Sequence, residues 1–145
     1  MNDKQVKDMD EPLNLVLFSG TDDRLNAAVV LAAGAAALGR TVNIFLQYWA
    51  LDAFRADRIG ADHGLAPEAG EAGRTAVDAL RAAGQSSWAD TLRQAKELGG
   101  VDIQACSLSM DLLHITEADL DPLVDGVEGV TAFHLSTGNG PVVFV

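Results

Sequence analysis

The residue with the clearest chemical potential in this sequence is Cys106, the only cysteine of the chain. It follows VDIQA, which is typical of a strand, and precedes SLSMDLL, which is typical of a short helix. A cysteine at such a junction lies near unpaired backbone N–H groups and the positive end of a helix dipole, both of which stabilise a thiolate. Because the thiolate is the reactive form, this position predicts a nucleophile. A buried thiol that serves as a small hydrophobic residue is the alternative.

The three histidines do not form an obvious site with this cysteine. His63, His114 and His134 fall in a loop, at a helix end and in an expected strand, and none is at metal-ligand spacing from a cysteine or carboxylate. No metal site and no cofactor site is therefore predicted. His114 follows Cys106 by eight residues, so it could approach the thiol as a base or as a cation. A partly exposed residue at the end of a helix is the other interpretation.

Two further patterns are better explained without chemistry. FSGT, at residues 18–21, has the strand–turn–helix position of a phosphate loop, but it lacks both G-x-G-x-x-G and G-K-[ST]. Asp22 and Asp23 would also repel a phosphate, so we interpret FSGT as a turn with a helix cap. Carboxylates of the last third are spread over a helix and its flanks, as on a solvated surface, and include Asp111, Glu117, Asp119, Asp121, Asp125 and Glu128.

An aromatic group follows the second expected strand. Tyr48, Trp49 and Phe54 could form a wall over a site at the end of that strand. We favour a role in the core or in a contact between subunits, where large aromatic side chains contribute most.

Length and composition predict one globular domain. The chain has 145 residues, of which 48% are hydrophobic and 21% charged. Residues 1–12 carry mixed charge without an apolar run, so we expect a flexible N-terminal tail before a domain at 13–145. The formal net charge of -11 argues against a nucleic-acid partner. No apolar run is long enough to span a membrane, and a lone cysteine without an internal disulfide indicates the cytoplasm.

The order of elements indicates an α/β fold. Short apolar runs predict strands at residues 13–18, 41–47, 101–106, 130–135 and 142–145. Helical spacing and capping signals predict helices at residues 22–38, 48–56, 76–81, 88–100, 108–113 and 118–124, the last limited by Pro122. Apolar strands that alternate with helices predict a single domain with a mainly parallel five-stranded sheet and helices on both faces. Sites in such folds lie at the carboxyl ends of the strands, where Cys106 falls.

Several segments together resemble the DsrE/DsrF-like family, in its peroxiredoxin-like branch of DsrE-related sulfur carriers. They occur in order from Leu13 to the C-terminus and read LVLFSGT, AAVVLAAGAAALGRTVNIF, YWALDAF, LRQAKELGGVDIQACSLSMDLL and GVEGVTAF. The most specific segment is ACSLSMDLL, which is similar to the cysteine motif of the family. The final crossover of the family is commonly helical, whereas STGNGP at residues 136–141 reads as a turn between two strands.

The resemblance implies a sulfur-carrying role for Cys106. In the family the cysteine accepts sulfane sulfur as a persulfide, and Ser107, Ser109 and Met110 match the surrounding motif without a catalytic assignment. Trimers or hexamers are implied, with rhodanese-type or TusA-type sulfurtransferases as partners. The helix at 22–38 is apolar nearly all round, which fits a surface that is partly shared between subunits.

Three functions remain open at this point. The first is a sulfur carrier or sulfurtransferase, which needs one cysteine and no resolving partner. The second is a non-catalytic oligomeric binding or assembly module in which Cys106 is buried and inert. The third is a peroxide-reactive thiol protein, which is less favoured because the proline, threonine and arginine of a peroxidase motif are absent around IQACSLSM.

Overall fold

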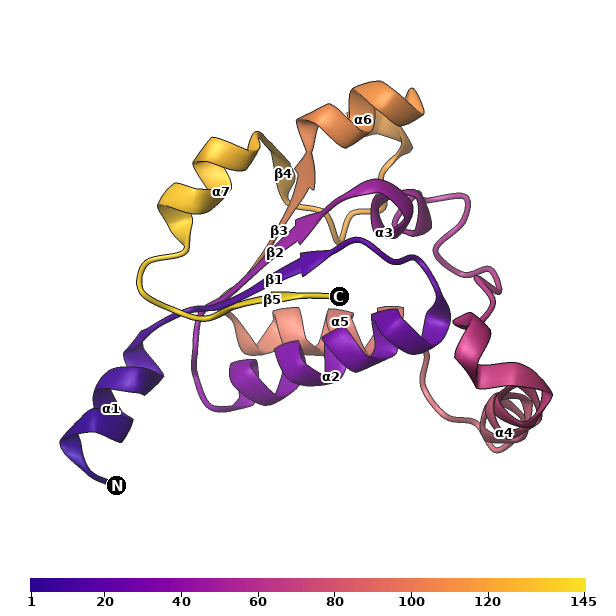
Figure 1. Cartoon of the computed structure of the whole chain (residues 1–145), viewed down its shortest axis with the longest axis horizontal. Helices are drawn as coiled ribbons and strands as arrows, with labels where there is room; N and C mark the ends of the chain where they lie inside the picture. Colours follow the sequence, from indigo (N-terminus) through magenta and orange to yellow (C-terminus); the bar gives the residue numbers. More distant parts are fainter.

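Five parallel strands form the centre of the fold (Figure 1), as the computed structural model of residues 1–145 shows. The strands are paired in the order β4-β3-β2-β1-β5, and every pair is parallel. Their bounds are Leu13–Leu17 for β1, Val42–Leu46 for β2, Val101–Cys106 for β3, Gly126–Glu128 for β4 and Val142–Phe144 for β5. The predicted single α/β domain with a parallel five-stranded sheet is therefore confirmed.

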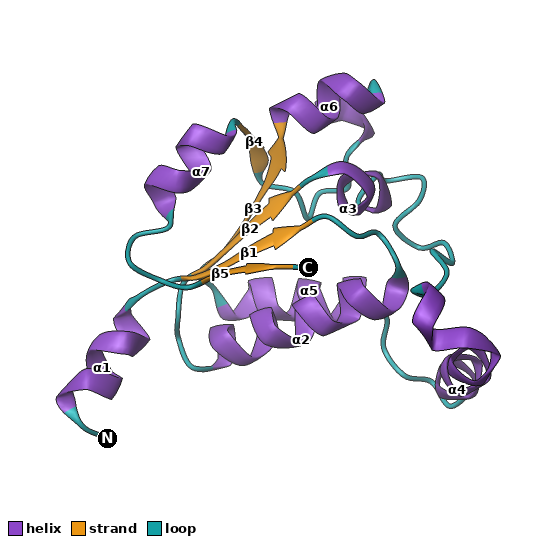
Figure 2. Ribbon diagram, in the orientation of Figure 1, coloured by secondary structure: helices purple, strands orange, loops and turns teal.

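Helices lie on both sides of this sheet (Figure 2). Below one face, α2 and α5 run side by side, whereas α7 crosses above the opposite face and α3 and α6 lie at the carboxyl ends of the strands. The helices are α1 Asp3–Asp10, α2 Asp22–Ala37, α3 Tyr48–Ala53, α4 Gly70–Ala82, α5 Trp88–Leu98, α6 Ser107–Leu113 and α7 Val130–Ser136. Two 3₁₀ turns cover Pro67–Ala69 and Glu117–Asp119.

The main core fills the space between the sheet and the α2/α5 pair. Successive residues of a strand point to opposite faces, so alternate positions of β1, β2 and β3 supply this core with Leu15, Ile44 and Ile103. Val29 of α2 and Leu92 of α5 meet them, and all five side chains are fully buried. Full burial of such side chains contributes about 1.5–3 kcal/mol each relative to exposure, so this face supplies much of the driving force for folding.

The opposite face carries a pair of amides, of which Asn14 is fully buried and Asn43 half-buried. Asn14 and Asn43 are register partners on β1 and β2, and the Asn43 side-chain amide donates to Asn14 Oδ1 at 2.9 Å. The Asn14 amide donates to the carbonyl oxygen of Thr137 at 3.0 Å, and the Asn43 amide donates to that of Ser136 at 3.1 Å. This pair therefore ties the carboxyl end of α7 to the two central strands.

Two predicted elements near the C-terminus were wrong. Residues 130–135 form helix α7 and not a strand, and the fourth strand is the shorter β4 before it. The chain must cross the sheet between β4 at one edge and β5 at the other, and α7 makes that crossing and buries Phe133. The final crossover is thus helical, and 137–141 forms only the turn after α7. The predicted helix at 118–124 is reduced to the turn Glu117–Asp119, because Pro122 cannot continue it.

The segments before and between the core elements also form helices. The segment expected to be a tail contains α1, which starts with a capping box between Asn2 and Gln5 and has no buried residue. The brief helical pattern at 76–81 is part of the longer α4, which likewise has no buried residue.

Removal of the Asn14 amide should destabilise the protein. Asn14 is completely buried, so Asn14→Ala leaves the Asn43 amide and the Thr137 carbonyl without this partner. The Asn43 amide keeps its hydrogen bond to the carbonyl oxygen of Ser136, so only one of its two hydrogen bonds is lost. We expect the free energy of unfolding to fall by about 1–2 kcal/mol, measured by urea denaturation. Asn139→Ala is the control, because Asn139 is exposed and its side chain makes no hydrogen bond. Equal stability of the two variants would contradict a structural role for the amide pair.

Candidate functional site

Cys106 lies at the junction predicted from the sequence. It is the last residue of β3 and the N-cap of α6, and its side chain is on the face opposite α2 and α5. The residue is only 4% exposed and forms a small cluster with Phe45 and Phe133. The two phenyl rings are stacked with centroids 4.9 Å apart, and Val16 packs against the cluster. The thiol is thus free but covered by aromatic side chains.

A carboxylate lies beside this thiol on the neighbouring strand. Glu128 of β4 is the register partner of Cys106 of β3, so the two side chains leave the same face of the sheet. Burial, and to a lesser degree the negative charge of Asp102, raise the pKa of Glu128 above its usual value. A carboxyl group that holds its proton more tightly places less negative charge beside the thiol.

The other residues of the cysteine motif have structural contacts. The Ser109 hydroxyl is buried and accepts a hydrogen bond from the Tyr48 backbone N–H at 3.1 Å. Tyr48 adopts a left-handed backbone with φ +42°, so this bond holds an uncommon conformation at the start of α3. Met110 packs in the main core, whereas Ser107 is half-buried. The motif therefore places the cysteine at the start of α6, and its Ser109 fixes α6 to α3.

The structure does not bring the histidines to the thiol. His114 is the exposed C-cap of α6 with φ +54°, and Cys106 is the N-cap, so a whole helix of about 10 Å separates them. His134 is exposed on α7, and His63 lies beside Trp88 with ring centroids 6.0 Å apart. No group of three or more His, Cys, Asp or Glu side chains is arranged to hold a metal ion.

The aromatic residues after β2 are divided between the core and the surface. Phe54 is fully buried against Trp88, with ring centroids 5.1 Å apart. Tyr48 contacts Phe18, whereas Trp49 is 54% exposed. These side chains form no wall over Cys106, and only Trp49 remains on the surface.

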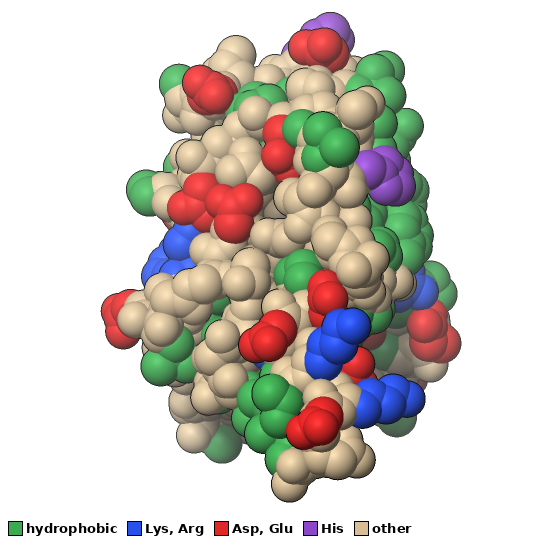
Figure 3. Space-filling model, turned by 90° about the vertical axis from the view of Figure 1, so that its left-hand side faces the viewer, with side chains coloured by type: hydrophobic (Ala, Val, Ile, Leu, Met, Phe, Trp, Pro, Cys, Tyr) green, Lys and Arg blue, Asp and Glu red, His purple; other side chains and the backbone are tan.

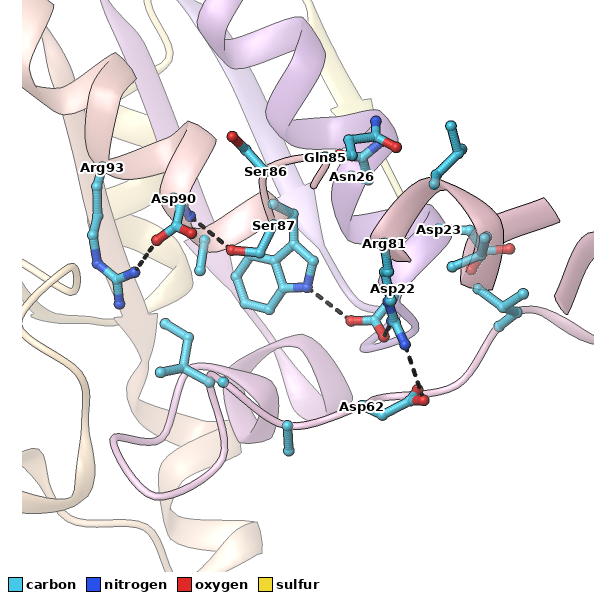
Figure 4. A pocket seen from close by; sticks show the side chains of 18 residues that line it. Asp22, Asp23, Asn26, Asp62, Arg81, Gln85, Ser86, Ser87, Asp90 and Arg93 are labelled. Carbon is cyan, nitrogen blue, oxygen red and sulfur yellow. Dashed lines mark hydrogen bonds and ion pairs between the residues drawn. The ribbon is translucent and has the colours of Figure 1, made fainter. Parts of the chain in front are cut away.

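A concave region lies between α4 and the amino ends of α2 and α5 (Figure 4). This cleft has a volume of about 700 Å³ and an ion pair at its base, in which Arg81 donates to Asp22 at 2.7 Å. The buried Asp22 carboxylate also accepts from the Trp88 indole N–H at 2.9 Å and from the His63 backbone N–H at 3.0 Å. The sequence pattern did not reveal this arrangement, because Asp22 and Arg81 are 59 residues apart.

Most charged groups around this cleft already form ion pairs or hydrogen bonds within the protein. Asp62 accepts from Arg74 at 2.6 Å and from Arg81 at 3.1 Å, and these bonds, first that of Arg74, hold the pKa of Asp62 well below its usual range. Asp23 accepts from the Ala66 backbone N–H, so FSGT leads into a turn that anchors residues 59–66 rather than into a phosphate loop. We therefore assign no chemistry to the cleft and treat Cys106 as the candidate site.

Comparison with known proteins identifies the family to which the chain belongs. Residues 9–68 match the model of the DsrE/DsrF/DrsH-like family. The uncharacterized protein YrkE of Bacillus subtilis is 30% identical over 149 residues, which cover 88% of this chain and 92% of YrkE. The chain belongs to the DsrE/DsrF/DrsH-like family.

Two solved structures share the fold. MTH1491 of Methanobacterium thermoautotrophicum, described as a protein of unknown function, superposes with a TM-score of 0.59 at 13% identity and covers 94% of this chain and 100% of its own. YchN of E. coli superposes with a TM-score of 0.57 at 13% identity and covers 94% of this chain and 99% of its own. None of the helices in this fold has the length and hydropathy needed to cross a bilayer.

The raised pKa of Glu128 predicts a pH-dependent effect of its charge on stability. The unfolded carboxyl group ionises near its usual pKa of 4.5, below its pKa in the folded protein. The folded state therefore binds more protons than the unfolded state between these two values, so the contribution of Glu128 is lost as the pH rises through them. The free energy of unfolding of Glu128→Gln, relative to that of wild type, should therefore be greater at about pH 7 than at about pH 4.

The check is urea denaturation at both pH values, with Glu117→Gln as an exposed control. A gain that is equal at both pH values, or equal in the control, would contradict a local effect at Glu128.

Proposed function

We propose that this protein carries sulfane sulfur as a persulfide on Cys106 and passes it to an acceptor thiol. The observation that carries the proposal is the position of the only cysteine of a DsrE-like chain, at the carboxyl end of β3 and directly before α6. Ligands and reactive groups of open parallel sheets lie at this edge. The absence of a second cysteine from the sequence also suits a carrier, which needs no resolving thiol.

The proposed transfer consists of two thiol exchange steps. In the first, the Cys106 thiolate attacks the outer sulfur of a donor persulfide, a new S–S bond forms, and the donor leaves as a thiolate with the electron pair of the old bond. In the second, an acceptor thiolate attacks the outer sulfur on Cys106 and releases the Cys106 thiolate. Each step forms one S–S bond and breaks another, so no external oxidant or reductant is needed. The cytoplasm, which keeps thiols reduced, is the matching compartment.

Partners for this chemistry are proteins that present a persulfide or a thiol, and we propose rhodanese-type or TusA-type sulfurtransferases. The surface around Cys106 offers apolar contacts, because Leu108 and Leu112 form an exposed i, i+4 pair on α6. Figure 3 views the molecule from the side of α7 and shows hydrophobic and acidic side chains over its upper part, with Lys and Arg lower down. A partner that docks here would fit best if its own interface had an apolar centre and a basic rim.

We also propose that the chain forms a homo-oligomer, a trimer or a hexamer, through α2. The outer side of this helix carries an exposed stripe without charge, which consists of Ala27, Val30, Leu31, Gly34, Ala37 and Leu38. Within one chain, the sheet and α5 cover only the inner side of α2. A second copy would cover the outer stripe and bury Val30 and Leu31, which are 57% and 48% exposed.

The oligomer can be tested with charges on this stripe. Val30→Glu combined with Leu31→Glu should reduce the molar mass, measured by size-exclusion chromatography with light scattering, from that of an oligomer to that of a monomer. The positions are exposed, so the fold should persist. Leu112→Glu on α6 is the control, with a side chain of similar exposure (54%) outside the stripe. A monomeric wild type, or an oligomer unaffected by the double substitution, would contradict the proposal.

A second candidate function is favoured by the burial of the thiol. A cysteine that is 4% exposed beneath two phenyl rings is also what an inert, structural thiol looks like. In that case the protein would be an oligomeric binding or assembly module of the same family.

Sulfur loading distinguishes the two candidates. After incubation with a persulfide donor, the intact mass of the wild type should increase by one sulfur atom, and a reducing thiol should remove the increase. Cys106→Ser should gain nothing, whereas Ser107→Ala, one residue away, should load like wild type. No gain in the wild type, together with a thiol that resists alkylation until the protein unfolds, would favour the assembly module.

A further inference from the structure

We propose that α7 is a lid over Cys106 and that Phe133 is the residue that controls access to the thiol. The position of Cys106 fits a reactive thiol, but its low exposure to solvent does not. A sulfur carrier must present its thiol to large partners, yet Cys106 is almost completely covered, and the cover includes Phe133 of α7. The biological role of the lid rests on the proposed sulfur transfer, whereas its existence concerns only the accessibility of Cys106.

Helix α7 buries a single side chain against the body of the protein. Phe133 is its only buried residue and is 3% exposed. Val130 and Leu135 are 52% and 84% exposed, and the remaining residues of the helix also face solvent. A helix with so little buried surface belongs to the part of a structure that opens at low cost, because opening exposes only the small cluster around Phe133 and leaves the main core intact.

The two ends of α7 are attached differently. The amides of Asn14 and Asn43 hold the carboxyl end through the carbonyl oxygens of Thr137 and Ser136. The amino end follows Gly129, which leads from the three-residue edge strand β4. Because the carboxyl end is fixed to central strands and the amino end to an edge, α7 should swing about its carboxyl end (Figure 1).

This motion would uncover the reactive atom. Phe133 stacks on Phe45, and both rings border Cys106, so the departure of Phe133 removes one wall of the thiol's surroundings. In the closed state the same ring shields Cys106 from thiols other than those of a partner that displaces α7. The lid thus restricts which thiols exchange sulfur with Cys106, and Phe133 determines this specificity.

The test is the rate of alkylation of Cys106 in the native protein by iodoacetamide, followed by intact mass. Phe133→Ala removes the ring that closes the lid, so alkylation should be on the order of tenfold to a hundredfold faster than in wild type. Leu135→Ala on the same helix is the matched control and should leave the rate unchanged, because that side chain is 84% exposed.

A second control separates the lid from general loss of stability. Val29→Ala destabilises the main core on the opposite face, far from α7, and should leave the alkylation rate near that of wild type under native conditions. The rate should also depend only weakly on low urea concentrations, because local opening exposes little surface.

Two results would overturn the lid. One is equal alkylation rates for Phe133→Ala and wild type; the other is a wild-type rate that follows global unfolding in urea and increases equally in Val29→Ala. Failure of the carrier function is a separate result. Fast alkylation of Phe133→Ala, in a protein that takes up no sulfur from a persulfide donor, would support the lid and contradict the sulfur-carrier function.

Discussion

The amide pair of Asn14 and Asn43 is the constraint on which the candidate site depends. Two polar side chains at matching positions of the central strands must find hydrogen-bond partners, because a buried amide without them costs free energy. They find each other and the last carbonyl groups of α7. These hydrogen bonds hold the end of the final crossover against the central strands, and in this position Phe133 packs on Cys106.

The two faces of the sheet differ in the side chains that they bury. One face meets α2 and α5 in a continuous apolar core. The other face combines the amide pair, the thiol and the half-buried Glu128 beneath a single short helix. Because the core on one face is stable by itself, the helix on the other face can be held weakly. Opening of α7 above Cys106 therefore does not require global unfolding. The cleft beneath α4 adds a third region, whose charges are paired and which lies apart from the thiol.

The sequence predicted the elements whose signals are local. Strands β1, β2 and β3 matched their apolar runs closely, and Cys106 was placed at a strand end before a helix. Residues 130–135 were misjudged because VTAFHL has the β-branched and aromatic residues of a strand, while its conformation is set by the crossing from β4 to β5. The contacts that define the site, such as Ser109 with Tyr48 and Asn14 with Thr137, join residues far apart in sequence and have no local signal.

The volume of the thiol's surroundings links sulfur carriage to the position of α7. Close-packed interiors respond even to the addition of one methylene group, and a persulfide would add a whole sulfur atom to the cluster of Cys106 with Phe45 and Phe133. Phe45 belongs to a central strand and cannot yield. Phe133 is the only buried residue of α7, and hydrogen bonds to the amide pair hold only the carboxyl end of that helix. Loading of Cys106 would therefore be accommodated by a shift of α7. A loaded carrier would then differ from an empty one at its surface, where an acceptor can distinguish them.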